Sequence, residues 1–241
     1  MKPSFDLDKI KFATDPVSFE KAVALYEKGK IKNFEEGMGT YSAIVEGGQF
    51  YHVSVEARRF GYGHCNCYLG EKDTLCKHMV ALSIFSVLGG KSIPQECKKL
   101  DDMPKSSGRP GNLSEDELRE AKKSISDSIK YIKPYAGPSR TWFAYQNSLS
   151  EGCHRLSAII SRLPVCATSA DLIVSLLLRL DKKLCVGGVD DSDGTVGGLM
   201  EGVVRVLENY AKLDASCIKS FEKLRGQDTC FGWEESLIKL L

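Results

Sequence analysis

The stretch 64–81 reads HCNCYLGEKDTLCKHMVA and decides how the first part of this chain folds. Three cysteines and a histidine stand in it with the pattern C-x-C-x8-C-x-H, namely Cys65, Cys67, Cys76 and His78. Three thiolates and one imidazole suit a tetrahedral zinc ion with no open coordination position. The sequence therefore predicts one structural zinc ion held by these four side chains. An iron–sulfur cluster is disfavoured, because such clusters usually take four thiolates.

The flanking sequence indicates which elements carry the four ligands. In an extended segment side chains alternate, so Cys65 and Cys67 would share one face and His64 would point to the other, which excludes it as a ligand. The eight residues between the two ligand pairs contain Gly and Asp and are expected to turn. Apolar residues then recur at helical spacing, so Cys76 and His78 are expected at a helix start, where unpaired N–H groups can donate to sulfur. The helical stripe is Met79, Leu82, Phe85 and Leu88, and Gly89-Gly90 ends it.

The residues before this stretch predict a helix and an antiparallel meander. Asp15 is a candidate N-cap and Pro16 fits the first helical position of a helix that closes at Gly29. Strand-forming runs separated by glycine-containing turns follow, at Ile31–Phe34, Thr40–Val45 and Phe50–Val55. A domain of this size has a small core, so a zinc ion joining its sheet to the next helix would contribute folding free energy.

The ligand pattern, with a basic residue in Cys76-Lys77-His78 and a helix after it, resembles the SWIM zinc finger family. The resemblance covers Phe19–Leu88, including the meander that ends in Tyr51–Val55. It implies a zinc-dependent module that binds DNA or protein, as in bacterial proteins, Swi/Snf-type helicases and transposase-related proteins. The later segments Gly137–Tyr145 and Val189–Gly197 resemble the C-terminal half of bacterial SWIM-family proteins, and the resemblance implies no activity for that half.

Composition shifts divide the chain into three parts. Residues 1–94 form the predicted zinc-binding domain, residues 95–112 (QECKKLDDMPKSSGRPGN) a linker, and residues 113–241 an all-helical domain. The linker contains Gly108-Arg109-Pro110, which is similar to the core of an AT-hook that enters the minor groove of A·T-rich DNA. The residues that flank this core directly are Ser and Gly rather than basic, so a flexible linker is the favoured interpretation.

The last part is expected to pack as antiparallel helices in a bundle or in hairpins. A capping box at Ser114–Glu117 starts the first helix. Asp190–Gly194 is interpreted as a helix start in which Asp193 is the cap and a carboxylate pairs with Arg140, with Ca²⁺ or Mg²⁺ binding as the less favoured alternative. Trp142 and Tyr145 are expected in the core. The other predicted helices are Thr141–Arg162, Ala170–Leu184, Val196–Leu213, Ser216–Leu224 and Trp233–Leu240.

Bulk properties describe a folded chain of 241 residues with 42% hydrophobic residues and a net charge of +1. The N-terminus lacks the apolar core of a signal peptide, and no apolar run is long enough to span a bilayer. Six of the nine cysteines stand outside the zinc pattern without C-x-x-C spacing, which predicts a cytoplasmic protein with free or metal-binding thiols. A second metal site built from Cys153-His154 and another late cysteine is the alternative to core burial of these residues, and burial is favoured. The six are Cys97, Cys153, Cys166, Cys185, Cys217 and Cys230.

The predicted fold class is α+β: a small zinc-clipped antiparallel sheet with flanking helices, followed by an all-α domain. The predicted function is non-catalytic recognition of a protein or nucleoprotein partner, as an adaptor without a small-molecule substrate or membrane. A closed zinc site argues against hydrolysis, and no P-loop, deaminase or nucleophile-elbow motif is present. The alternative is direct DNA binding. Tentative contacts to DNA or partner are Arg58, Arg59, Lys72, Lys77, Lys91 and Arg109.

Overall fold

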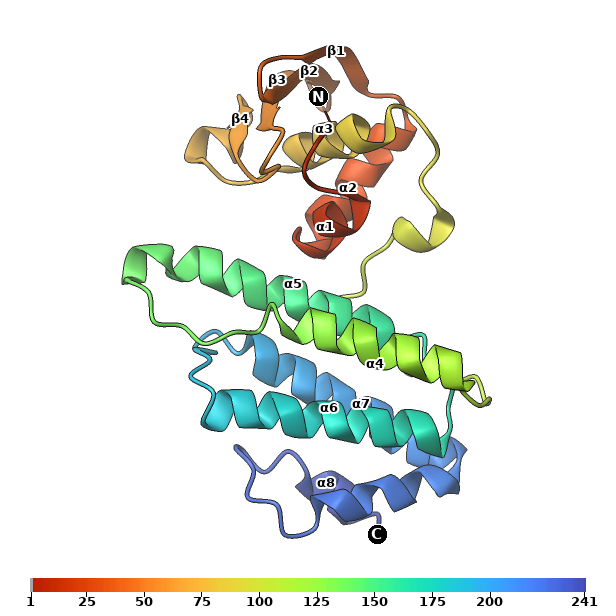
Figure 1. Cartoon of the computed structure of the whole chain (residues 1–241). Helices are drawn as coiled ribbons and strands as arrows, with labels where there is room; N and C mark the ends of the chain where they lie inside the picture. The colour runs from red at the N-terminus through yellow and green to blue at the C-terminus, as the bar shows by residue number, and fades with distance from the viewer. Residues whose placement is uncertain (1) are drawn as a thin grey trace. The chain divides into compact units, whose positions relative to one another are not determined.

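The computed structural model describes residues 2–241, apart from the side chain of Arg140. The chain forms two compact units, an N-terminal unit that ends at Leu100 and a C-terminal unit from Asp101 to Leu241. The fold is mixed α+β, with an antiparallel sheet and helices in the first unit and helices in the second (Figure 1). None of the helices within residues 2–241 is both long and apolar enough to cross a membrane.

The sheet of the N-terminal unit is an antiparallel meander with the strand order β1-β2-β3-β4. Its hairpin β2–β3 pairs without interruption, from Thr40 opposite Glu56 to Glu46 opposite Phe50. The expected three-strand meander is confirmed, and each strand runs one or two residues beyond its predicted end. The strands are β1 (Ile31–Glu36), β2 (Thr40–Glu46), β3 (Phe50–Glu56) and β4 (Gly63–Cys65).

Helix α3 (Lys77–Leu88) packs against the sheet on one side and against α2 (Pro16–Glu27) on the other. This position explains why every residue from His78 to Ile84 is buried, since a helix covered on two sides has no exposed face there. The predicted start of α2 is confirmed, because the Asp15 side chain accepts a hydrogen bond from the N–H of Ser18 at 2.8 Å.

A short helix, α1 (Leu7–Phe12), precedes α2 and was not expected from the sequence. Its start has a recognisable signal, because Asp6 caps it by accepting a hydrogen bond from the N–H of Lys9 at 2.7 Å. Six residues are too few for a clear helical periodicity, so packing against α3 decides its conformation.

The C-terminal unit is all-helical. Helix α5 packs against α4 and α7, and α6 packs against α7 and the 3₁₀-helix η4, around one large apolar core (Figure 1). The capping box of α4 is confirmed, with Ser114 and Glu117 hydrogen-bonded reciprocally. The elements are α4 (Glu115–Ile129), η3 (Ser139–Thr141), α5 (Trp142–Ile160), α6 (Ala167–Cys185), α7 (Thr195–Leu213), η4 (Ala215–Leu224) and α8 (Glu235–Ile238).

Two predicted helices near the C-terminus differ from the structure. The segment predicted as Ser216–Leu224 is the 3₁₀-helix η4, and the helix predicted over Trp233–Leu240 is only Glu235–Ile238. Both segments are short, so local propensity does not determine their hydrogen-bonding pattern, whereas the contacts of Phe221, Leu224 and Leu237 with the core do.

The segment predicted as a linker divides between the units. Its first part contains the short 3₁₀-helix η2 (Gln95–Cys97), and the chain passes into the C-terminal unit after Leu100. Arg109 is held there through its backbone, because its carbonyl accepts a hydrogen bond from the N–H of Val165 at 2.7 Å. The hydroxyl of Ser107 donates to the carbonyl of Leu163 at 2.7 Å. Residues 105–110 are therefore anchored beside the α5–α6 loop, which corrects the expectation of a flexible linker over that stretch.

The start of α7 uses a different carboxylate from the one predicted. Asp191 accepts from the N–H groups of Val196 and Gly197 at 2.7 and 2.8 Å, whereas Asp193 accepts only from Thr195, at 3.1 Å. The expected Arg140 partner lies outside the described side chains. Among the described residues this segment forms no group of side chains close enough to share a metal ion.

Of the two aromatic residues expected in the core next to this segment, one is buried and the other is half-buried. Tyr145 is buried, whereas Trp142 is half-buried and its indole N–H donates to Asp190 at 3.0 Å. The hydroxyl of Tyr145 also accepts from the N–H of Asp190, at 2.9 Å. Both rings therefore help to hold the segment that leads into α7.

Candidate metal centre

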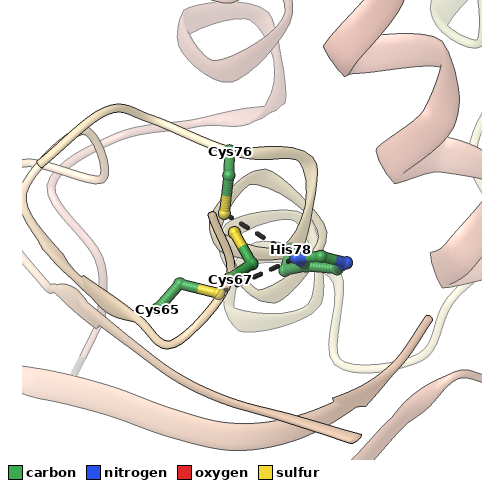
Figure 2. A group of neighbouring side chains, drawn as sticks. All are labelled: Cys65, Cys67, Cys76 and His78. Atoms are coloured by element: carbon green, nitrogen blue, oxygen red, sulfur yellow. Dashed lines mark hydrogen bonds between the residues drawn. The ribbon is translucent and has the colours of Figure 1, made fainter. Parts of the chain in front are cut away.

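The four predicted ligands come together at the junction between the end of β4 and the start of α3 (Figure 2). Cys65 is the last residue of β4, Cys76 is the N-cap of α3, and His78 lies in its first turn. Cys67 lies beyond the end of β4, so the prediction that both cysteines share one strand face is wrong. Cys67 instead begins the turn that leads into the 3₁₀-helix η1 (Gly70–Lys72), where its carbonyl accepts a hydrogen bond from the N–H of Glu71 at 2.9 Å.

The geometry of this Cys3His cluster fits one tetrahedral metal ion. The three sulfurs and one ring nitrogen all lie within 4.8 Å of one another, and all four residues are buried. Nδ1 of His78 is 3.7 Å from Sγ of Cys65 and 3.9 Å from Sγ of Cys76. A zinc ion with its usual bond lengths to sulfur and nitrogen places its ligand atoms about 3.6–3.8 Å apart. The two nitrogen–sulfur distances are therefore close to the separation that such an ion requires.

Backbone N–H groups point at all three sulfurs. The N–H of Gly70 donates to Cys67 at 3.4 Å, that of Cys67 to Cys65, and that of Met79, in the first turn of α3, to Cys76. Such donors stabilise thiolates, which are the form that binds a metal. The hydrogen bond between the Cys65 and Cys76 thiols lowers the pKa of Cys76 and raises that of Cys65.

Packing contacts hold the imidazole ring of His78, and its Nε2 atom makes no hydrogen bond to a described residue. Nδ1 faces the sulfurs, and Nε2 is buried with no hydrogen-bond partner among the described residues. The ring stacks on Tyr51, with a centroid distance of 4.1 Å and an interplanar angle of 23°. A Cβ atom placed on Gly47 would lie 2.9 Å from Nε2 and 2.9 Å from the Tyr51 ring. Packing against the β2–β3 turn thus orients the imidazole. In most metal sites a hydrogen-bond acceptor on the other ring nitrogen orients a ligating histidine.

Sequence reasoning missed the glycines that make room for the cluster. Gly47 was interpreted as a turn residue and Gly70 as part of a loop. A Cβ on Gly70 would lie 2.1 Å from the carbonyl oxygen of Cys65, so only glycine fits where η1 crosses the end of β4. His64 was excluded correctly, because it is exposed and stands apart from the cluster.

The basic residues predicted to contact DNA or a protein partner lie in different local environments. In the N-terminal unit, the Arg59 guanidinium lies 4.2 Å from the Tyr62 ring centroid and the Lys72 ammonium 4.1 Å from that of Tyr68. Arg58 and Lys91 are exposed, and Lys77 is the half-buried first residue of α3. Arg109 belongs to the C-terminal unit, where its side chain donates to the carbonyl of Arg162 at 3.3 Å.

Two of the six cysteines outside the cluster form a disulfide, so the expectation that all six are free or metal-bound is wrong. Cys185 and Cys230 form a disulfide between residues 45 positions apart in sequence, a pairing that spacing alone does not reveal. Cys153 is buried, and its neighbour His154 pairs with Asp102 at 3.2 Å. Cys153 and His154 therefore belong to none of the groups of metal-ligating atoms that lie close together among the described residues.

Comparisons of the chain with protein-family models, with curated proteins and with solved structures find no match.

Proposed function

We propose that this chain is a non-catalytic zinc-binding recognition module of the SWIM type that acts as an adaptor for a protein or nucleoprotein partner. The observation that carries the proposal is the buried Cys3His cluster, whose four donor atoms lie within 4.8 Å of one another, with Nδ1 of His78 at 3.7 and 3.9 Å from two of the sulfurs. Catalytic zinc sites keep a coordination position for water or substrate, and a site with four protein donors keeps none. A zinc ion in such a closed site would have a structural role and would hold β4 and α3 together.

The surface beside the cluster supplies groups suited to a partner. Tyr62 and Tyr68 are 53% and 71% exposed, and a basic side chain lies over each ring. Aromatic and arginine side chains are enriched at protein interfaces, where they supply much of the binding energy. The net charge of +1 is close to zero, which favours a protein partner over nonspecific binding to nucleic acid.

Direct DNA binding is the second candidate, and the same two cation–aromatic pairs favour it. Exposed tyrosines can stack on unpaired bases, while Arg58, Arg59 and Lys72 can neutralise phosphates. The two candidates differ in their salt dependence, because phosphate contacts release counterions and protein docking does not depend on that release.

Zinc content tests the proposed metal. Protein purified without added metal and with its disulfide intact should carry about one zinc equivalent per chain, measured by atomic absorption. The Cys76→Ser variant should lose it, and Cys166→Ser should retain it as the matched control, since Cys166 lies at the N-cap of α6 in the other unit. Zinc near zero in the wild type, or zinc retained in Cys76→Ser, would contradict the proposal.

The surface is tested by replacing Arg58 and Arg59 with alanine in one variant. If DNA is the partner, affinity for a labelled DNA measured by anisotropy should fall, and the salt slope should decrease by about one per lost phosphate contact. If a protein is the partner, DNA affinity is negligible near physiological salt, and capture from nuclease-treated lysate falls instead. The control replaces Lys122 and Lys123, exposed on α4. Equal behaviour of both variants would exclude this surface from recognition.

A further inference from the structure

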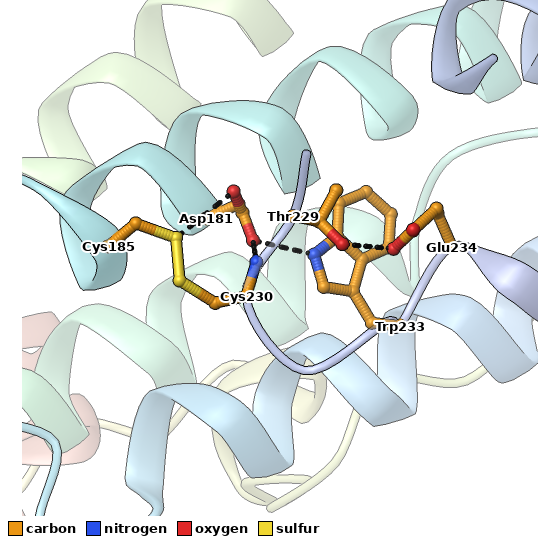
Figure 3. Close-up of a disulfide and its surroundings, with 6 residues drawn as sticks. All are labelled: Asp181, Cys185, Thr229, Cys230, Trp233 and Glu234. Carbon is orange, nitrogen blue, oxygen red and sulfur yellow. Dashed lines mark hydrogen bonds between the residues drawn. A yellow bond between two sulfur atoms is a disulfide. The ribbon is translucent and has the colours of Figure 1, made fainter. Parts of the chain in front are cut away.

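A second cluster of metal-ligating side chains lies in the C-terminal unit, apart from the Cys3His cluster (Figure 3). Asp181 and Cys185 stand four residues apart at the end of α6 and so share one face of the helix. Cys230 joins them from the loop before α8. The carboxylate oxygen and the two sulfurs lie within 4.8 Å of one another, and the two sulfurs form the disulfide. We call these three residues the Asp181 cluster.

The carboxylate of Asp181 is held in one orientation by the loop that carries Cys230. The side chain is only 7% exposed. Its Oδ1 accepts hydrogen bonds from the N–H of Cys230 and from the indole N–H of Trp233, both at 2.9 Å. A metal-binding carboxylate is commonly positioned by hydrogen bonds to its other oxygen, which is the arrangement here.

The other carboxylate oxygen points at sulfur. Oδ2 of Asp181 lies 3.4 Å from Sγ of Cys185, which can donate a hydrogen bond only as a thiol. A disulfide sulfur carries no hydrogen, so in the oxidised chain Oδ2 has no donor among the described residues. No cationic side chain among those residues forms an ion pair with Asp181 either. Reduction gives Oδ2 a thiol donor, but loss of the two thiol protons would place a carboxylate and two thiolates together, and a divalent cation bound between them would remove the cost of that repulsion.

We propose that Asp181, Cys185 and Cys230 form a second binding site for a divalent, thiophilic metal ion such as Zn²⁺, which is available only when the disulfide is reduced. A dithiol reductant supplies two electrons and two protons, so the S–S bond breaks, two thiols form, and the dithiol becomes a disulfide. The metal ion then displaces the two thiol protons to solvent and binds two thiolates and Oδ2.

The site would differ from the Cys3His cluster in one respect. Three protein donors leave a fourth coordination position, and Cys185 is exposed, so water can reach it. Oxidation would close the site again by joining its two sulfurs. The C-terminal unit would therefore bind this second metal ion in a reducing environment and release it on oxidation.

The test counts zinc in the full chain under two redox conditions. The protein is loaded with excess Zn²⁺ after reduction with a phosphine, or with its disulfide intact, and unbound metal is removed. The reduced chain should retain about two equivalents and the oxidised chain about one. One equivalent in both states, or two in both, would overturn the proposal.

Variants assign the second equivalent to its ligands. In the reduced state Cys230→Ser should retain about one equivalent, and Asp181→Asn should bind the second ion at least about 10-fold more weakly. Cys166→Ser is the control and should retain both. Wild-type affinity for the second ion in Asp181→Asn would exclude the carboxylate as a ligand and overturn the site. Circular dichroism of each variant confirms that it is folded, and Asp181→Asn, which conserves shape, keeps the test decisive if Cys230→Ser does not fold.

The same experiment separates this site from the one in the N-terminal unit. Cys65→Ser should lose the first zinc equivalent and keep the second in the reduced state. If Cys65→Ser instead binds none, the second site does not exist and the Cys3His site stands. If Cys65→Ser and the wild type both bind one equivalent that Cys230→Ser loses, the Cys3His site fails and the second site stands.

Discussion

At the scale of single residues, packing contacts rather than a hydrogen bond to Nε2 position the imidazole ring of His78. Its Nδ1 faces the sulfurs of Cys65 and Cys76, while its Nε2 has no acceptor among the described residues. The Tyr51 ring and the bare Cα of Gly47 therefore decide where the imidazole lies. Zinc affinity should be sensitive to volume at Gly47, although this residue has no functional group.

The Gly47→Ala variant tests this sensitivity. Its Cβ would lie 2.9 Å from Nε2 of His78, so the imidazole must shift away from its place against the sulfurs. We expect zinc affinity, measured by competition with a chromophoric chelator, to fall about 10- to 100-fold, as it does when the hydrogen-bond partner of a ligating histidine is removed. The control is Gly48→Ala, whose Cβ meets nothing within 4 Å. Equal affinity in both variants would show that the turn does not position His78.

At the scale of elements, the start of α7 depends on a residue several positions before the helix. Asp191 accepts hydrogen bonds from the N–H groups of Val196 and Gly197, and Gly194, with a φ of +73°, lets the chain turn between them. Unpaired N–H groups in a first helical turn are costly when they lie beside a core, and Val196 is fully buried. One carboxylate therefore satisfies two donors at the edge of the C-terminal core.

Replacing Asp191 with alanine should destabilise the C-terminal unit by about 0.5–2 kcal/mol, the range found for loss of a helix cap. The matched variant Asp193→Ala loses one hydrogen bond at an exposed position and should cost less. Urea unfolding followed by circular dichroism measures both free energies. A larger loss in Asp193→Ala would restore the assignment expected from the sequence.

At the scale of the whole molecule, the two units have separate cores of different kinds. The C-terminal core is large and apolar, and helices α4 to α7 and η4 contribute to it. The N-terminal unit has a four-stranded sheet and three α-helices within its described residues, and the proposed zinc ion ties β4 to α3. Small domains depend more on such links, because they bury a smaller fraction of their surface.

Removal of zinc should therefore unfold one unit and spare the other. With a strong chelator we expect the sheet signal and the α2 and α3 helical signal to be lost, because metal-binding free energy is folding free energy in such a domain. Amide hydrogen exchange would locate the loss before Leu100, while α4 to α7 keep their protection. Simultaneous loss of protection in both units would show that they fold as one.

The sequence by itself determined the local features, because neighbouring residues decide them. The spacing of Cys65, Cys67, Cys76 and His78 identified the cluster. The cap at Asp15 and the capping box at Ser114 placed helix starts, and runs of strand-forming residues between glycine-containing turns placed β2 and β3. Each signal lies within one element or one turn, where side-chain chemistry and backbone geometry are coupled directly.

Only the tertiary structure decided the features that join distant residues. It paired Cys185 with Cys230, placed Trp233 on Asp181, and brought Gly47 against His78. It also anchored residues 105–110 beside Val165 and gave η4 its 3₁₀ form. These contacts depend on how whole elements pack. Packing minimises the free energy of the complete core, so no pattern within a short window of sequence reveals it.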